Sequence, residues 1–471
     1  MRAKPTLLFV DGLWVEKHGI MALIPHLERN GFAVHLRLTR NTRRLLSSVA
    51  ELRPDIVAFS VTTGWHGKAL QMARAVRTHF PGIRILLGGP HVTYFPEVAL
   101  DPAVDFAFVG ECDTDIAPAL LALLDGADPS TIPNLAFRAD STHQAGSLGF
   151  GPLSPLVEDL DSLPLPDREH YCRHRFFRHS PYKSFIVSRG CPHDCAFCFN
   201  RKLKEMYRGK GRFLRYRSPE SVVEEALEVR RRFGMKLASF EDDLLTCDRP
   251  WLEKLLTLWR SRVDVPYNLN ATAQALTDER LVRLLRETGI WCVAFGVETG
   301  NESLRTSVLN KRLTDEQVLT AGALLHKHGV RFLTYNMFAL PGERFDDALQ
   351  TVRLNRRIGT RLARCTLFTP YPGTELGDKL VRNPDGGEML FSRSSATSPD
   401  QARIERLQKL ALLGMRSPVG EALARMASSL PAGPTHDLLF WATYFRAVRE
   451  YMKTGTLHLL ELGLRSMTDV L

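Results

Sequence analysis

Short apolar runs alternate with amphipathic stretches along the first 140 residues. The apolar runs have the length of buried strands and lie at 6–10, 34–38, 56–60, 83–87 and 106–109. The amphipathic stretches repeat apolar residues at helical spacing and lie at 18–31, 41–53, 67–79 and 113–125. Strands that alternate with helices predict an α/β fold with a doubly wound, Rossmann-like parallel sheet.

A second alternating series begins at residue 185. Strands are predicted at 185–188, 237–241, 267–271, 291–297, 331–338 and 363–368. Helices are predicted at 219–233, 249–262, 278–288, 314–328 and 344–358. These strand–helix units predict a curved parallel sheet or partial (β/α)6 barrel, whose functional site lies in the loops after the strands.

The two series define the domain organisation. Between them, residues 126–182 are irregular and proline-rich, with a last strand near 132–137 and an extended linker at 156–167. Beyond 380 the pattern is mixed and helical, and the run Leu438–Phe445 forms its apolar centre. We predict a first domain at 1–140, a linker at 141–180, a barrel at 181–380 and a helical C-terminal region at 381–471. That last region either packs on the barrel or shapes substrate access.

Composition narrows the class of protein. The 471 residues suffice for two or three domains, and 44% hydrophobic with 24% charged residues is typical of a soluble globular protein. No apolar run approaches the length of a membrane span, and the N-terminus lacks a signal-peptide layout. The eight cysteines show no disulfide framework, which favours a reducing, cytoplasmic location. A net charge of +10 suits anionic partners or simply solubility.

Three loops of the first domain follow strands at the edge where such sheets bind ligands. Ser60 and Thr62 offer hydroxyl groups after one strand, and Gly110 and Glu111 follow another. Between them comes the segment Gly88, Gly89, Pro90 and His91, in which paired glycines allow a flat ligand to approach the backbone. Ordinary turn chemistry is the alternative. A GxGxxG fingerprint is absent, which argues against NAD or FAD.

The strongest chemical signal is Cys191, Cys195 and Cys198, which lie in the loop after the first strand of the second series. A structural zinc site needs four protein ligands. A [4Fe–4S] cluster held by three cysteines instead leaves one iron open for a substrate or cofactor. The spacing therefore favours a cluster, and a zinc site or an incidental grouping is the alternative.

This loop resembles the cluster motif of the radical S-adenosylmethionine (SAM) superfamily. The resemblance implies that the three cysteines bind a [4Fe–4S] cluster, that SAM binds its open iron, and that Phe197 lies near the SAM adenine. Phe240-Glu-Asp-Asp243 and Gly296-Val-Glu298-Thr-Gly300 resemble further elements of the family, which implies SAM contacts at Asp243 and Glu298. Asp243 is alternatively a cap for the helix near 248–250.

Other elements of the second series carry the same resemblance. Asn270 is a further SAM contact by this resemblance, at a position where many relatives have arginine or another polar group. Met337–Glu343 and Pro370–Thr374 resemble the loops after the fifth and sixth strands of the family.

The first domain and the linker at 159–167 resemble B12-dependent radical SAM enzymes. The resemblance implies that cobalamin contacts Ser60, Thr62, Gly88, Gly89, Pro90, His91, Gly110 and Glu111. The Asp-x-His-x-x-Gly signature is missing, because Leu13 stands where its histidine would be. Either the lower face of the cobalt lacks that histidine, or the fold has lost its cofactor. Trp65, His66 and His91 either approach the corrin or serve as hydrogen-bonding residues.

The implied function is a B12-dependent radical SAM enzyme, with a resemblance that covers residues 5–375. The first hypothesis is a C-methyltransferase that uses a 5′-deoxyadenosyl radical and methylcobalamin to methylate an unactivated carbon of a small natural-product-type substrate. The second is a B12-dependent cyclase or rearrangement enzyme in pigment, lipid or antibiotic biosynthesis. A non-catalytic iron–sulfur or cobalamin sensor would not need the SAM elements at 240–243 and 295–300. No catalytic residue is predicted.

The expected partners follow from this chemistry. They are a small-molecule substrate and an external electron donor of the flavodoxin or ferredoxin type, with no membrane. The basic run at 201–217 contains interleaved aromatic residues and would suit RNA. Because it directly follows the cluster loop and no RNA-binding module accompanies it, we favour a role in that loop and in domain contact.

Overall fold

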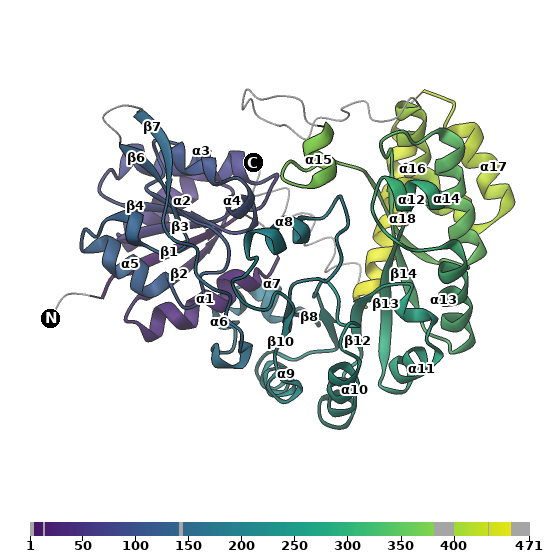
Figure 1. The fold of residues 1–471 in the computed structure, drawn as a ribbon, viewed down its shortest axis with the longest axis horizontal. Helices are drawn as coiled ribbons and strands as arrows, with labels where there is room; N and C mark the ends of the chain where they lie inside the picture. Colours follow the sequence, from purple (N-terminus) through teal and green to yellow (C-terminus); the bar gives the residue numbers. More distant parts are fainter. Residues whose placement is uncertain (1–3, 13–14, 141–144, 381–399, 432, 454–471) are drawn as a thin grey trace. The chain divides into compact units, whose positions relative to one another are not determined.

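The computed structural model describes residues 4–12, 15–140, 145–380, 400–431 and 433–453. This part of the chain forms two compact units, drawn in Figure 1. Unit 1 contains the residues up to 179 and also 207–212. Unit 2 contains 180–206 and the described residues from 213 onward.

Unit 1 is built on a seven-stranded sheet in the order β2-β1-β3-β4-β5-β6-β7. The neighbours from β2 to β5 are parallel, and β6 and β7 are antiparallel additions. The strands are β1 (Thr6–Asp11), β2 (Ala33–Leu38), β3 (Ile56–Ser60), β4 (Arg84–Gly88), β5 (Phe106–Phe108), β6 (Leu135–Asp140) and β7 (Ala145–Phe150). The helices are α1 (His18–Arg29), α2 (Thr42–Leu52), α3 (His66–His79), α4 (Pro90–Tyr94), α5 (Ile116–Leu124), α6 (Glu169–Cys172) and α7 (Arg175–Arg178).

Both faces of this sheet are covered. Leu7 and Phe9 of β1 share a core with apolar residues of α1 and α5. Leu8 and Val10 point to the opposite face, because side chains alternate along a strand, and they are buried as well. The continuous apolar runs of the sequence are therefore those of a sheet buried on both sides. The predicted doubly wound fold is confirmed.

Strand β7 lies where the sequence analysis placed an irregular segment. Its sequence Ala-Gly-Ser-Leu-Gly-Phe has little strand propensity, so the pattern gave no signal. Pairing with β6 provides the strand instead. A side chain at Gly149 would come within 2.6 Å of the Phe137 ring, so the glycine makes room for that ring.

Unit 2 is built on a six-stranded parallel sheet in the order β15-β14-β13-β12-β11-β8. Its strands are β8 (Tyr182–Phe185), β11 (Leu237–Phe240), β12 (Tyr267–Ala271), β13 (Ile290–Glu298), β14 (Phe332–Phe338) and β15 (Leu362–Leu367). The connecting helices are α9 (Pro219–Phe233), α10 (Arg249–Leu258) with a π turn at Trp259–Val263, α11 (Glu279–Glu287), α12 (Glu302–Ser307), α13 (Asp315–Lys327) and α14 (Phe345–Arg357). The predicted partial barrel is confirmed.

The two faces of this sheet differ in character. Phe185, Leu269 and Phe295 point into the large core shared with the connecting helices. The alternate residues of the same strands point the other way, to what we term the inner face, and include the polar Asn270 and Tyr335. The part of the inner face around Asn270 and Tyr335 is polar and is therefore suited to a site.

The first barrel strand ends earlier than the pattern predicts. The apolar run at 185–188 is divided between the end of β8 and β9 (Ser188–Arg189), which pairs with β10 (Arg215–Tyr216). The cause is the Asp242 carboxylate. Its Oδ1 accepts from the amides of Val187 and Ser188 at 2.9 and 2.6 Å, which takes these amides out of the main sheet.

The remaining helices are α8 (Phe199–Met206), α15 (Glu375–Leu380), α16 (Gln401–Arg416), α17 (Pro418–Ala427) and α18 (Pro434–Met452). Helix α18 packs on the inner face, where Ala447 shares a small core with Cys292, Leu333 and Leu362. Asn268 Nδ2 donates to the carbonyl of Tyr451 at 3.0 Å and helps to hold the end of the helix.

The apolar run Leu438–Phe445 is predicted from the sequence to form the centre of the helical region, and this prediction is wrong. Leu438 is 70% exposed and Trp441 is 50% exposed. The helix is held at both ends, by His436 and Asp437 at its start and by the carbonyls of Glu450 and Tyr451 near its end.

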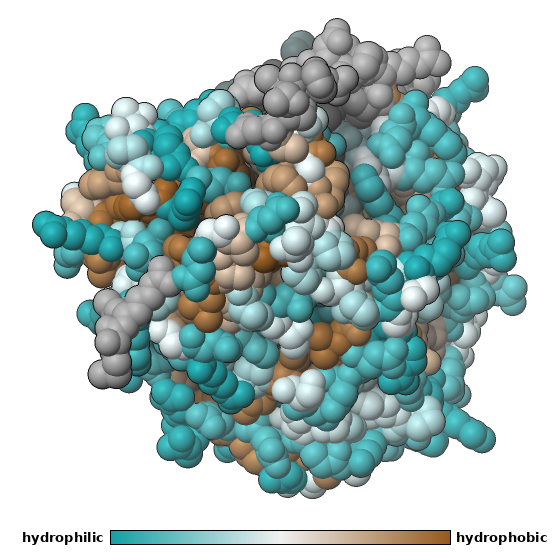
Figure 2. Space-filling model, turned by 60° about the vertical axis from the view of Figure 1, so that its left-hand side comes forward, coloured by the Kyte–Doolittle hydropathy of each residue, from teal (hydrophilic) through white to brown (hydrophobic). Residues whose placement is uncertain are grey.

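The surface agrees with a chain that buries most of its apolar residues. Figure 2 shows one face of the molecule, on which hydrophilic side chains predominate and hydrophobic ones form separate patches. None of the helices in the described residues has the length and apolar character that crossing a bilayer requires.

Candidate active site

The cysteine loop begins directly after β9 and ends where α8 begins. Gly190 starts it with a φ of +90°, and a side chain there would come within 2.4 Å of the Phe213 carbonyl oxygen. The loop is held at Ala196, whose amide donates to the carbonyl of Leu309 and whose carbonyl accepts from the amide of Leu376. This attachment fixes the loop while Cys191, Cys195 and Cys198 on either side stay partly exposed.

The three cysteines are unpaired thiols in one electrostatic environment. Burial, with a smaller effect of the neighbouring Cys198, raises the pKa of Cys191 to about 12 and that of Cys195 to about 11. Burial also raises the pKa of Cys198, and Asp243 and Glu298 add to the effect. The structure thus brings the three predicted ligands together with both predicted SAM-binding carboxylates.

The loop has the number of thiols that a cluster with one open iron requires. In the described part of the chain, no three His, Cys, Asp or Glu side chains are placed to hold one metal ion. In a [4Fe–4S] cluster each cysteine binds a different iron, so its sulfurs need not converge on one point. Three thiols in one short loop, with no fourth cysteine in it, match a cluster that keeps one iron open.

Glu298 ends β13 and is neutralised by a lysine that the sequence analysis missed. Lys311 Nζ donates to Glu298 Oε1 at 2.7 Å and to the carbonyl of Gly296 at 2.9 Å. A side chain at Gly296 would come within 1.8 Å of Glu298 Oε1, so this glycine makes room for the ion pair. Glu298 itself has a φ of +66°, which is rare for a non-glycine residue and frequent at functional sites.

The three acidic residues after β11 have different surroundings. Asp242 is fully buried, and Tyr182 donates to the Glu241 carboxylate. Asp243 is exposed and accepts a hydrogen bond from Asn200 Nδ2 at 2.9 Å. Asn200 follows Cys198 by two residues. Asp243 does not cap the next helix, because Asp248 does so by accepting from the amide of Trp251.

Asn270 lies on the inner face between two neighbours. Its Nδ2 donates to the carbonyl of Asp242 at 3.0 Å, and its Oδ1 accepts from the hydroxyl of Tyr335 at 3.3 Å. Tyr335 was also missed, although its alternation with Met337 on a predicted strand placed it on this face. Phe197 is partly buried against the small core around Ala196.

In unit 1, the predicted cobalamin residues all lie at the carboxyl ends of β3, β4 and β5. The loops are linked through Val61, whose amide donates to the Gly88 carbonyl and whose carbonyl accepts from the amide of His91. Gly89 has a φ of +100°, and a side chain there would come within 3.0 Å of the Val61 carbonyl oxygen. Thr93 Oγ1 accepts from the amide of Gly110 at 3.0 Å. Of the other predicted residues here, Ser60 ends β3, Thr62 follows two residues later, and Pro90 begins α4.

His91 is engaged within this loop cluster. Its Nδ1 bonds with the Thr63 hydroxyl at 3.0 Å, and its ring stacks on His66 at 4.2 Å. Burial and His66 lower the pKa of His91 to about 4, so the ring is neutral at pH 7. His91 therefore makes hydrogen-bonding and stacking contacts within the loop cluster, as in one of the two alternatives that the sequence left open.

Glu111 connects this edge to the basic run. Its amide donates to the hydroxyl of Tyr207 at 2.7 Å, and its carbonyl accepts from Asn134 Nδ2 at 2.9 Å. Tyr207 is buried, and Lys210 Nζ donates to the carbonyl of Leu153. Residues 207–212 of the basic run therefore pack within unit 1.

One observation tests whether cobalamin suits this edge. The Trp65 side chain is buried beside Gly12, and its Nε1 has no hydrogen-bond partner among the described residues. A buried N–H donor without a partner is costly. The amide side chains of a corrin would offer acceptors, so the residues present fit this group.

Two family models match the chain in the order that the geometry suggests. The model of the B12 binding domain matches residues 9–120, and that of the radical SAM superfamily matches residues 185–354. The chain carries a B12 binding domain followed by a radical SAM domain, the combination found in cobalamin-dependent radical SAM enzymes.

Named relatives of this chain fall into two groups. An uncharacterized methyltransferase of Pyrococcus horikoshii, PH0819, is 25% identical over 339 residues, or 71% of each chain. An anaerobic magnesium-protoporphyrin IX monomethyl ester cyclase of Rubrivivax gelatinosus is 27% identical over 350 residues, which are 70% of this chain and 60% of the cyclase.

Among solved structures, the radical SAM methyltransferase TsrM of Kitasatospora setae shares the fold. Its TM-score is 0.64 at 17% identity, with 80% of this chain and 75% of TsrM covered. The cobalamin-dependent enzyme OxsB has the same TM-score at 16% identity, and 55% of its chain is covered.

Proposed function

We propose that this protein is a cobalamin-dependent radical SAM C-methyltransferase that acts on an unactivated carbon of a small natural-product-type substrate. The observation that carries the proposal is the set of three unpaired cysteines beside Glu298 and Asp243, at the strand ends of a parallel half-barrel. The B12 binding domain adds the second cofactor site, and relatives named as methyltransferases favour methyl transfer.

The chain's own residues would bind and orient the cofactors. Cys191, Cys195 and Cys198 would hold the cluster, and Asp243 and Glu298 would receive the cationic groups of SAM. Lys311 keeps the buried Glu298 in a fixed position while leaving its second oxygen for a ligand. When bound, the cluster and SAM supply a 5′-deoxyadenosyl radical, and cobalamin supplies the methyl group.

The other predicted residues would complete the two cofactor sites. Asn270 would direct its amide toward SAM from the inner face, and Phe197 would lie against the adenine. In unit 1, the cobalamin contacts would be Ser60, Thr62, Gly88, Gly89, Pro90, His91, Gly110 and Glu111, with Trp65 Nε1 as an added donor.

A B12-dependent cyclase is the second candidate, because the relative from Rubrivivax aligns with 70% of this chain and is named as a cyclase. Both candidates require the same cofactors. They differ in whether a methyl group passes from SAM through cobalamin to the substrate.

We further propose an external electron donor of the flavodoxin or ferredoxin type and a cytoplasmic location. All eight cysteines are unpaired, as in compartments that keep thiols reduced. The domain boundaries proposed for function are a cobalamin domain at 1–140, a linker at 141–180, a radical SAM core at 181–380 and a helical region at 381–471.

The test is anaerobic reconstitution of the full chain with iron, sulfide and cobalamin, followed by incubation with SAM and a reductant. We expect four irons per chain, bound cobalamin, and formation of 5′-deoxyadenosine and methylcobalamin. Cys195→Ala should lose the cluster, while Cys247→Ala, at an exposed cysteine outside the triad, should keep it. An iron–sulfur chromophore that survives unchanged in Cys195→Ala would refute the proposal. 5′-Deoxyadenosine without methylcobalamin would favour the cyclase.

A further inference from the structure

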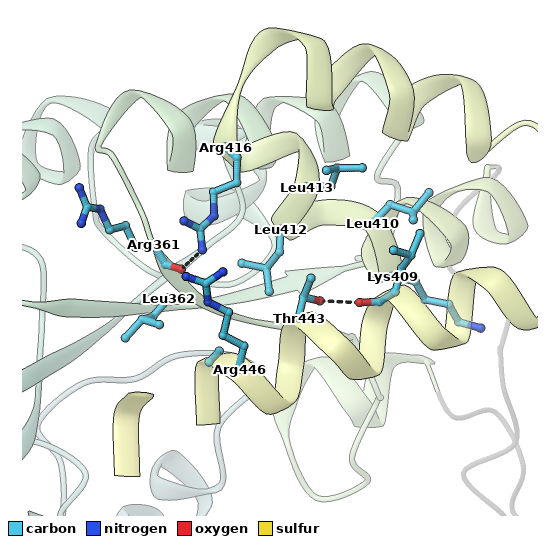
Figure 3. Close-up of a pocket in the computed structure, with 11 residues that line it drawn as sticks. Arg361, Leu362, Lys409, Leu410, Leu412, Leu413, Arg416, Thr443 and Arg446 are labelled. Atoms are coloured by element: carbon cyan, nitrogen blue, oxygen red, sulfur yellow. Dashed lines mark hydrogen bonds between the residues drawn. The ribbon is translucent and has the colours of Figure 1, made fainter. Parts of the chain in front are cut away.

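A cavity lies in unit 2, away from the strand ends that carry the cysteine loop. It has a volume of about 320 Å³ and is enclosed by α16, α18 and the start of β15 (Figure 3). This volume falls within the range of small-molecule pockets. Leu362, the first residue of β15, lines it, so the cavity opens at the opposite end of the strand from the candidate active site.

The interior of the cavity is apolar. Leu362, Leu410 and Ala447 line it and are buried. Leu413 and Leu439 also line it and are 39% and 47% exposed, so they form its rim. The Thr443 hydroxyl donates to the carbonyl of Leu439 in its own helix at 2.9 Å. The interior therefore suits a hydrocarbon body and offers it little hydrogen bonding.

Two solvent-exposed arginines lie at one edge of this apolar cavity. The guanidinium groups of Arg416 and Arg446 point toward one another in Figure 3. Arg416 Nη2 donates to the carbonyl of Arg361 at 3.0 Å, and Arg446 Nε pairs with Glu450 at 3.0 Å. Among the described residues, Arg416 has no carboxylate partner, whereas Arg446 has Glu450.

Two further cations line the cavity, Lys409 and Arg361. Lys409 pairs with Asp437. Figure 3 shows the Lys409 ammonium and the Arg361 guanidinium directed away from the other two arginines, so the charge at this edge comes from Arg416 and Arg446. Like charges that converge beside an apolar space favour an anion between them.

We propose that this cavity binds an amphipathic anion, with an alkyl chain among the leucines and a carboxylate or phosphate head between Arg416 and Arg446. Guanidinium groups match the planar geometry of a carboxylate and also suit phosphate. The alkyl chain accounts for the leucine-lined interior, which a small inorganic anion would leave unfilled. This site is separate from the one assigned to SAM and cobalamin.

The test is a displacement titration with the full chain. The fluorescent probe is 11-(dansylamino)undecanoate, and the competitors are dodecanoate and dodecyl phosphate below their micelle concentrations. We expect saturable binding of one probe per chain and displacement by both competitors. Dodecanol, which lacks the charge, and acetate, which lacks the chain, should displace at least tenfold less effectively.

Variants locate the binding. An Arg416→Gln, Arg446→Gln double variant should weaken probe binding at least tenfold, and so should Leu413→Trp, which fills the cavity from its rim. Arg425→Gln is the matched control, at an exposed arginine of α17 that does not line the cavity. Circular dichroism melting curves that coincide with wild type show that each variant is folded.

Three results would overturn the proposal. One is the absence of saturable probe binding to the folded wild type. Another is equal binding by the double variant and Arg425→Gln. The third is co-sedimentation with phosphatidylglycerol vesicles that dodecanoate does not compete for, in a protein that does not bind free dodecanoate. That result would assign the apolar surface to a lipid bilayer instead.

Discussion

Replacing Asp242 by alanine should detach the end of the first barrel strand. The Asp242 Oδ1 accepts from the amides of Val187 and Ser188 and from the Ser188 hydroxyl. Both residues are buried, so water does not replace the lost acceptor. Each buried donor left unsatisfied costs about 1–3 kcal/mol. For the two amides the free energy of unfolding should fall by about 2–6 kcal/mol.

The assay for this change is both local and global. Urea unfolding of the reduced apoprotein measures the loss, and hydrogen–deuterium exchange of a peptide across 185–190 reports on the two amides. Because Cys191 follows Ser188 by three residues, iron content after reconstitution should fall as well. Asp242→Asn keeps one acceptor oxygen and should lose clearly less stability. An alanine variant as stable as wild type, or an asparagine variant that loses as much as alanine, would refute the reasoning.

Three further predictions concern charge, pH and backbone. Lys311→Met leaves the buried Glu298 carboxylate without its cation, which should lower the free energy of unfolding in urea by about 3–5 kcal/mol. The added change Glu298→Gln should restore most of that loss, and a double variant no more stable than Lys311→Met would contradict the ion pair. Burial raises the pKa of Asp242 to about 7, above its ordinary value of 3.8. The protonated carboxyl group contributes fully to stability below about pH 4. As the pH rises from about 4 through 7, the free energy of unfolding should fall by about 4 kcal/mol in all. Asp242→Asn should lack this part of the pH dependence, and parallel stability–pH curves for variant and wild type would argue against it. Gly89→Ala forces a side chain into a positive φ and against Val61, so cobalamin affinity should fall at least tenfold by spectroscopic titration, whereas Gly82→Ala, in open space, should bind normally.

Most of the fold could be predicted because its strands are covered by helices and read as apolar runs. The helix at 219–233 was predicted at its observed bounds, since Ser218 caps it and Pro219 begins it. The first barrel strand was misplaced because a buried aspartate, distant in sequence, takes two of its amides. Strand β7 was missed because its glycines hide the pattern.

In the candidate site too, some residues could be predicted from the sequence and others could not. Cys191, Cys195 and Cys198 were identified because all three lie in one short loop with a spacing that has few uses. Lys311 was missed because it stands 13 residues from Glu298 and in no motif. Its role comes from a turn after α12 that only the folded chain shows. The exposure of Trp441 was missed for a related reason, since periodicity does not say how much of a helix its neighbours cover.

The short return of the chain into unit 1 bears on how such proteins can be recombined. Residues 207–212 belong to unit 1, although the residues on both sides belong to unit 2. A cut at residue 180 would therefore take Tyr207 away from the amide of Glu111 and Lys210 away from the carbonyl of Leu153. The two units are not exchangeable modules with a boundary at one point of the gene. If unit 1 were fused to the second unit of another protein, residues 207–212 would have to be transferred with it. Without them, the position that the buried Tyr207 side chain fills would be empty.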